Sequence, residues 1–122
     1  GFTTGSAVCI CPPASIDTIL DNFQQALNIP DSVLEGMTRM LFTHYGNDLD
    51  KRVSTLKNVR TLSIPALIIH DDKDYDIPWE DGRAVADAWP GAEFKLTHGL
   101  GHRRILRDPA TVAAVTEFIT NR

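Results

Sequence analysis

The chain has 122 residues, of which 43% are hydrophobic and 23% charged, a composition typical of one globular domain and not of a disordered segment. Its formal net charge is −4, which argues against a nucleic-acid binder or a binder of anionic membranes, because such surfaces need clustered Lys and Arg. The sequence contains no apolar stretch long enough to span a bilayer, and its first residues lack the pattern of a signal peptide.

The first half of the chain is predicted to be one strand followed by helices. The apolar run at residues 7–11 is typical of a buried strand, and the Pro12-Pro13 pair ends it. Ser15 is a suitable N-cap for the helix that follows. The predicted elements after the strand are helices over residues 16–27 and from Asp31 or Ser32, a turn at 44–48 and a short helical piece around 49–56.

The second half alternates strands and helices. A continuous apolar run at residues 66–69 favours a central parallel strand buried on both faces, whereas the alternation at 93–97 favours a strand nearer an edge. Helices are predicted over residues 81–89 and from Pro109. This order predicts the α/β class, with a three-strand parallel sheet flanked by helices and connected by right-handed crossovers.

The two cysteines, Cys9 and Cys11, are predicted to lie on one face of the first strand, two residues apart. So close a pair rarely forms an unstrained disulfide, so we expect buried free thiols in a reducing compartment and hence a cytoplasmic protein. A metal site would need more ligands nearby in the sequence, and none follow. We therefore expect no metal and no cofactor.

Two polar loops follow the predicted strands of the second half. Asp74 comes five residues after Ile69, and His102 comes five residues after Thr97. In doubly wound sheets the loops beyond the carboxyl ends of neighbouring strands lie side by side and carry the functional groups. A carboxylate that accepts a hydrogen bond from one imidazole nitrogen fixes the tautomer and supports the imidazolium during proton transfer, so Asp74 and His102 are the predicted catalytic residues.

Residues 64–119 resemble the α/β-hydrolase family. The family pattern is an apolar run, His, a small residue, two variable residues, the acid, two more variable residues, an aliphatic residue and Pro, and residues 67–78 follow it with Asp74 as the acid. Asp71 departs from the pattern, because the small residue is usually Gly. The sequence Gly99-Leu100-Gly101-His102 matches the family's histidine loop.

This resemblance implies a division of the chain into three parts. Residues 1–15 would hold the core strand before the lid, 16–58 the helical cap or lid, and 59–122 the C-terminal core that carries the triad acid and histidine. It also implies a serine-type hydrolase of ester or similar acyl bonds, with His102 as general base and Asp74 as its orienting acid. The substrate would be a small acyl ester, lysophospholipid-like esters included; relatives with similar C-terminal halves also act on epoxides or C–C bonds.

The family's nucleophile motif, Gly-x-Ser-x-Gly, is absent from the sequence. The stretch at residues 1–5 has the glycine spacing with Thr3 in its middle, but no strand precedes it and no room remains for the helix that the motif requires. We therefore expect a C-terminal portion of a longer hydrolase whose serine and oxyanion hole lie upstream. Its partner would be the missing N-terminal half, or a second chain that covers the sheet edge.

Other interpretations of the same residues stay open at this point. The acidic loop and the glycine-flanked histidine are also compatible with solvated surface groups, Asp72 is the alternative acid, and His70 would order the acid loop. A calcium loop is disfavoured, because Ile77 and Arg83 stand where an EF-hand needs Gly and Glu. The alternative function is a non-catalytic, self-associating binding module derived from a hydrolase, a homodimer that pairs through its open sheet edge.

Overall fold

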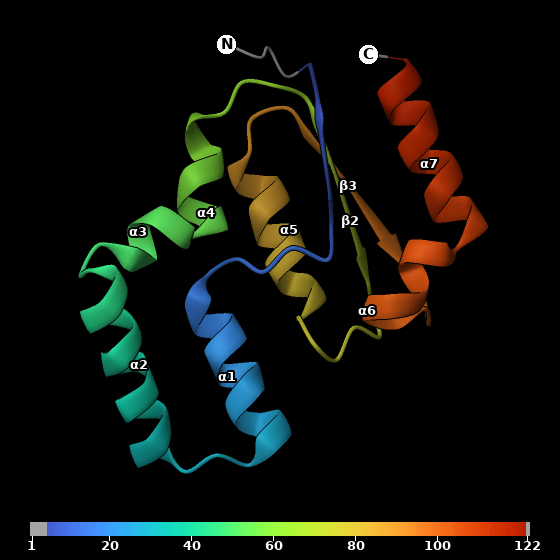
Figure 1. The fold of residues 1–122 in the computed structure, drawn as a ribbon. Helices are drawn as coiled ribbons and strands as arrows, with labels where there is room; N and C mark the ends of the chain where they lie inside the picture. The colour runs from blue at the N-terminus through green and yellow to red at the C-terminus, as the bar shows by residue number, and fades with distance from the viewer. Residues whose placement is uncertain (1–4, 122) are drawn as a thin grey trace.

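The computed structural model describes residues 5–121. Three parallel strands form one sheet in the order β1 (Ala7–Ile10), β2 (Ala66–Asp71), β3 (Ala92–Thr97) (Figure 1). The register places Ala66 opposite both Ala7 and Ala92. The predicted α/β class and parallel sheet are confirmed, with the continuous apolar run in the middle. Thr3, the residue weighed as a nucleophile, lies outside the described residues.

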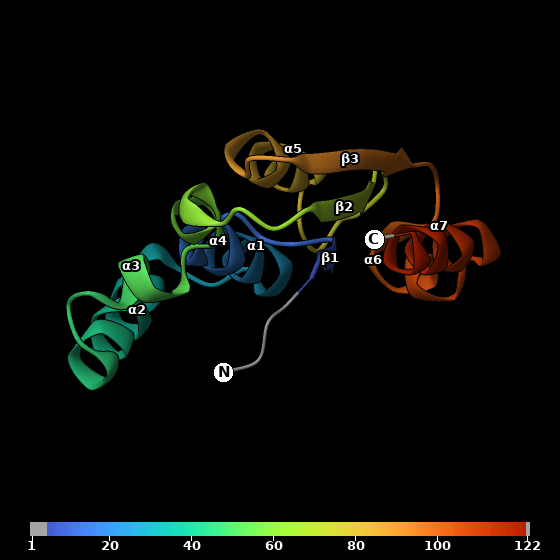
Figure 2. The same cartoon turned by 90° about the horizontal axis from the view of Figure 1, so that it is seen from above.

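Helices cover both faces of this sheet (Figure 2). One face packs against α4 (Thr55–Asn58), the short 3-10 turn η1 (Val59–Thr61) and α5 (Trp79–Ala88). The other face packs against α6 (Gly101–Arg104), the 3-10 turn η2 (Ile105–Arg107) and α7 (Pro109–Thr120).

Strand β2 is the centre of the core because it is covered on both sides. All six of its residues are buried. Ala66 and Ile68 contact the α5 side, and Leu67 and Ile69 contact the α7 side. This alternation continues into His70, which faces Gly82 of α5, and Asp71, which faces the loop before α6. An apolar strand thus ends in two buried polar residues that point to opposite faces.

The cysteine prediction is wrong in one respect. Cys9 packs on the α5 side of the sheet, whereas Cys11 packs on the α7 side. The physical reason is the backbone at Cys11, which has φ of 53° and therefore interrupts the alternation of side chains just after β1 ends. Both thiols are free; Cys11 is buried and Cys9 half-buried.

Between β1 and β2 the chain forms a helical segment that extends away from the sheet (Figure 1). It comprises α1 (Ile16–Leu27), α2 (Asp31–Tyr45) and α3 (Leu49–Val53). Ser15 caps α1 as predicted, its hydroxyl accepting from the N–H of Thr18 at 3.4 Å. No residue of α1 or α2 is buried.

Several element boundaries differ from the prediction. Strand β1 ends at Ile10, β2 continues to Asp71 and β3 begins at Ala92, each one or two residues from the predicted bound. The predicted turn at 44–48 begins later, because α2 continues to Tyr45 and ends at Gly46 with φ of 99°. Helix α5 begins at Trp79, two residues early, because Pro78 precedes it and Glu80 and Asp81 suit its first turn. Within residues 5–121, none of the helices combines the length and the apolar character that crossing a membrane requires.

Candidate active site

The three parallel strands end at the same edge of the sheet, and the polar residues gather there. Cys11 follows β1, Asp74 lies three residues after the end of β2, and His102 lies five residues after β3. The structure brings all three together, with ligand-type atoms within 4.8 Å of one another. The sequence indicated two of these residues and missed Cys11.

Asp74 and His102 form a direct pair. His102 Nδ1 lies 2.8 Å from Asp74 Oδ2. The Asp74 side chain has no exposed surface, whereas 36% of the His102 side chain is exposed. The carboxylate is therefore held inside the protein and the ring is presented at its surface, the geometry needed for an oriented base that meets a reactant.

The backbone of the acid loop holds the Asp74 carboxylate in place. Its Oδ1 accepts from the N–H groups of Asp76 and Ile77 at 2.9 and 2.8 Å. Burial by itself raises the pKa of Asp74, but the N–H of Ile77, the His102 ring and the Cys11 thiol outweigh burial and leave the pKa below its ordinary value. Asp74 is accordingly ionised at neutral pH and able to accept from His102.

His70 supports the same carboxylate from below. Its Nε2 lies 3.0 Å from the carbonyl oxygen of Ile77 and 3.2 Å from Asp74 Oδ2, so this nitrogen carries the proton. Its Nδ1 is buried without a hydrogen-bond partner among residues 5–121, on the side where Gly82 leaves room for the ring. His70 orders the acid loop, as the sequence predicted.

Asp71, the departure from the family pattern, links the acid loop to the histidine loop. Its Oδ1 accepts from the N–H groups of Lys73 and Gly101 at 2.9 and 2.8 Å, and its Oδ2 accepts from the Thr97 hydroxyl at 2.7 Å. Burial opposes ionisation, yet these donors lower the pKa of Asp71 to about 2. Because Gly101 directly precedes His102, the Asp71 carboxylate fixes the start of the segment that carries the ring.

Asp72, the alternative acid, lies against a different histidine. Its Oδ2 is 2.8 Å from His98 Nδ1, and its Oδ1 accepts from the N–H of Gly99 at 3.0 Å. The His98 contact is the main reason that the pKa of Asp72 is lowered. The structure thus assigns Asp72 to the outer side of the loop, away from His102.

Arg104 also stabilises the backbone of the histidine loop. Its guanidinium donates to the carbonyl oxygens of Leu100 and Gly99 at 2.9 and 2.8 Å. Both contacts lie within the arginine's own loop, so they fix the backbone that leads into His102.

Cys11 lies on the buried side of the pair. Burial, followed by the nearby Asp74 carboxylate, raises the pKa of the Cys11 thiol to about 12, so it is a protonated donor to Asp74 at neutral pH. Sequence reasoning treated Cys11 only with Cys9, because its distance along the chain from Asp74 and His102 hid their proximity.

A groove of about 620 Å³ opens beside the exposed edge of the His102 ring. Residues of both loops line it, and these are Lys73, Tyr75, Asp76, Gly99, Leu100, Gly101, His102, Arg103 and Arg104. The groove therefore gives open access to the His102 ring, and no described residue that lines it is a serine.

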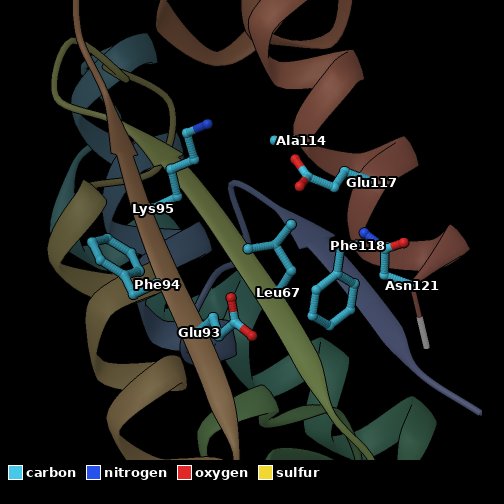
Figure 3. Close-up of a pocket in the computed structure, with 8 residues that line it drawn as sticks. All are labelled: Leu67, Glu93, Phe94, Lys95, Ala114, Glu117, Phe118 and Asn121. Atoms are coloured by element: carbon cyan, nitrogen blue, oxygen red, sulfur yellow. The ribbon is translucent and has the colours of Figure 1, made fainter.

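A second groove lies between β3 and α7, away from the Asp74–His102 pair. Figure 3 shows Leu67 and Phe118 near each other in it, with Glu93 and Lys95 on the β3 side, Glu117 on α7 and Asn121 just after α7. It shares no lining residue with the groove at His102. This groove marks an incompletely covered part of the sheet face.

A smaller pocket of about 230 Å³ joins the helical segment to the acid loop. The side-chain amide of Asn22 on α1 donates to the carbonyl oxygen of Asp76. Ile19 and Phe23 of α1 line the pocket opposite Tyr75 and Ile77. The helical segment thus borders the candidate site with apolar side chains.

Comparisons with known proteins bear on the fold. No protein-family model and no curated protein matches the chain. Three similar solved structures are Rv0554 from Mycobacterium tuberculosis (20% identity, TM-score 0.65), the esterase RhEst1 from Rhodococcus sp. ECU1013 (19%, 0.58) and MGS-MChE2, an alpha/beta hydrolase enzyme from a lagoon-sediment metagenome (15%, 0.61).

These likenesses extend over nearly all of the chain but over only part of each neighbour. They cover 96%, 95% and 97% of this chain and 57%, 56% and 51% of the respective neighbours. The chain therefore spans a little over half the length of the structures that it matches.

Proposed function

We propose that this chain, which has an α/β-hydrolase fold, supplies the acid and the general base of a serine-type hydrolase that acts on ester or similar acyl bonds. The observation that carries the proposal is the 2.8 Å contact between buried Asp74 and half-exposed His102 at the carboxyl end of the sheet. That edge is where doubly wound α/β folds place their reacting groups.

The proposed roles of Asp74 and His102 follow from the geometry of the pair. Asp74 engages Nδ1 of His102, which leaves Nε2 to take a proton from a nucleophile and later return it to the leaving group. The proposed nucleophile is a serine upstream of this chain, in the part of the fold that the chain does not span. That part would also provide the oxyanion hole and would be this chain's partner.

Residues 16–58 are the proposed lid, that is, the helical segment α1–α3 together with α4, which packs against the sheet. Its α1 lines a pocket with the acid loop, and the pocket is lined mainly by apolar side chains, which suits the acyl part of a small ester.

The test is ester turnover by the complete protein. Because the base takes part in every proton transfer whereas the acid only orients and stabilises it, we expect His102→Ala to lower kcat by roughly 10⁶-fold and Asp74→Asn by roughly 10⁴-fold. Asp72→Asn is the matched control, because its carboxylate contacts His98 and not His102. Turnover near wild type in either test variant would refute the assignment.

A non-catalytic, self-associating module is the second candidate. One observation favours it: in the described part of the chain β1 and β3 each have a single strand neighbour, so both present an open edge. Sedimentation of the isolated chain separates the candidates. If the isolated chain is a stable homodimer and the complete protein does not hydrolyse esters, the module is favoured. If the isolated chain is a monomer, the result counts against the module.

A further inference from the structure

We propose that Cys11, Asp74 and His102 form a binding site for a thiophilic divalent cation such as Zn²⁺, in competition with the Asp74–His102 pairing. The binding proposal rests on the three side chains alone. Its consequence for catalysis rests on the proposed function.

The three residues supply a sulfur, an oxygen and a nitrogen donor, the set that Zn²⁺ uses in proteins. Their ligand-type atoms lie within 4.8 Å of one another. In a tetrahedral zinc site, bonds of about 2.0–2.3 Å place neighbouring ligand atoms about 3.5 Å apart. The adjustment required is therefore on the order of 1 Å, and the partly exposed His102 ring is the member free to make it.

The charge at this point favours a divalent cation. The Asp74 side chain has no exposed surface and Cys11 is buried, so a carboxylate and a thiolate here would stand close together away from solvent. A bound Zn²⁺ supplies two positive charges against these two negative charges, so it removes the repulsion between them.

Neighbouring groups already orient the ligands. The N–H groups of Asp76 and Ile77 hold Oδ1 of Asp74, and His70 Nε2 lies 3.2 Å from Oδ2. Such outer contacts are typical of metal sites, where they fix the carboxylate and strengthen binding. Of the three ligands, His102 lines the groove between the two loops, so a cation would approach the site from the side of this ring.

Binding requires a balanced exchange of protons. The Cys11 thiol loses its proton to solvent, and the imidazole nitrogen that binds the cation must carry no proton, so the bound ring holds its proton on the other nitrogen. One proton is thus released for each Zn²⁺ bound. Because the cation occupies the acid and the base at once, it would inhibit the proposed hydrolase.

The experiment is calorimetric titration of the chain with ZnCl₂ in buffers of different ionisation enthalpy. We expect one Zn²⁺ per chain with release of about one proton. Cys11→Ser and His102→Ala should each weaken binding by about 10-fold or more, since they remove a direct ligand and loss of an outer contact alone costs that much.

Cys9→Ser is the matched control. Cys9 lies two residues away but packs on the other face of the sheet, so its removal should leave zinc affinity unchanged. Equal weakening in the Cys9 and Cys11 variants, or no weakening in the Cys11 variant, would overturn the proposal.

X-ray absorption of the zinc-loaded wild-type chain tests the ligand set directly, so the proposal stays testable even if a variant does not fold. One sulfur at about 2.3 Å together with nitrogen or oxygen ligands near 2.0–2.1 Å is expected. A spectrum with nitrogen and oxygen ligands only would overturn the proposal. Both measurements are made without a substrate, so they can fail while the catalytic assignment stands, or succeed while it fails.

Discussion

The central strand β2 and the α1–α2 hairpin were both predicted from hydrophobic patterns, but they have opposite burial. Every residue of β2 is buried, whereas no residue of α1 or α2 is. The exposed large apolar residues of the hairpin are Ile19, Phe23, Leu27, Val33, Met40 and Tyr45. Hydrophobic periodicity thus predicts the type of element correctly in both regions, but it does not show what the apolar face packs against.

This contrast bears on the proposed function. The sheet positions Asp74 and His102 through buried backbone and carboxylate contacts, which favours a fixed geometry. The hairpin keeps an apolar face open beside the acid loop. A rigid acid–base pair beside a loosely packed apolar element is what the proposed lid role requires, and four experiments examine that difference.

The largest effect should come from emptying the core. Ile68 of β2 is fully buried, so Ile68→Ala should lower the free energy of unfolding by about 2–5 kcal/mol. Met40 of α2 is 72% exposed, so Met40→Ala should change it by no more than about 0.5 kcal/mol. Urea denaturation of both variants measures the difference, and similar losses would remove the distinction between the regions.

The next effect concerns Asp71 and depends on pH. The pKa of Asp71 is lowered to about 2 from an ordinary 3.8, so its ionised form contributes about 2 kcal/mol above pH 4. Since the folded-state pKa is the lower one, this contribution is lost as pH falls from about 4 toward 2. The stability difference between wild type and Asp71→Asn should therefore shrink over that range.

Denaturation curves at several acidic pH values check the Asp71 prediction. Asp87→Asn serves as the control, because Asp87 is an exposed α5 carboxylate that pairs with Arg83 at the surface. A difference that does not vary with pH would show that Asp71 acts through its shape and not through its charge.

A smaller loss is expected from filling the space against His70. A Cβ at Gly82 would lie 2.3 Å from His70 Nδ1, so Gly82→Ala must displace the ring that supports Asp74. We expect a loss of about 1–3 kcal/mol and a weaker Asp74–His102 contact, visible as a changed imidazole nitrogen NMR spectrum. Gly36→Ala on α2 is the control, because nothing lies within 4 Å of its Cβ position; equal losses would contradict the close packing at His70.

The smallest effect belongs to the hairpin. Asn28 ends α1 with φ of 51°, a conformation that glycine adopts at less cost. Asn28→Gly should stabilise α1 by no more than about 1 kcal/mol, and hydrogen exchange should slow within α1 while β2 is unaffected. Slower exchange throughout the sheet would mean that the two regions unfold together, which would weaken the comparison.

The sequence alone determined the α/β class, the parallel strands and the acid and histidine candidates, because these depend on local periodicity and on motif spacing. The continuous apolar run at 66–69 predicted β2, and the positions of Asp74 and His102 after their strands predicted a shared edge. These inferences required only that parallel strands end on the same side of the sheet.

Only the tertiary structure decided which side chains meet. The positive φ at Cys11 places its thiol beside Asp74, on the face opposite Cys9. Asp72 contacts His98 rather than His102. Buried Asp71 connects two loops that are 30 residues apart in the sequence. These contacts depend on strand register, on a single backbone angle and on which carboxylate each loop N–H group reaches. No local pattern in the sequence records those quantities.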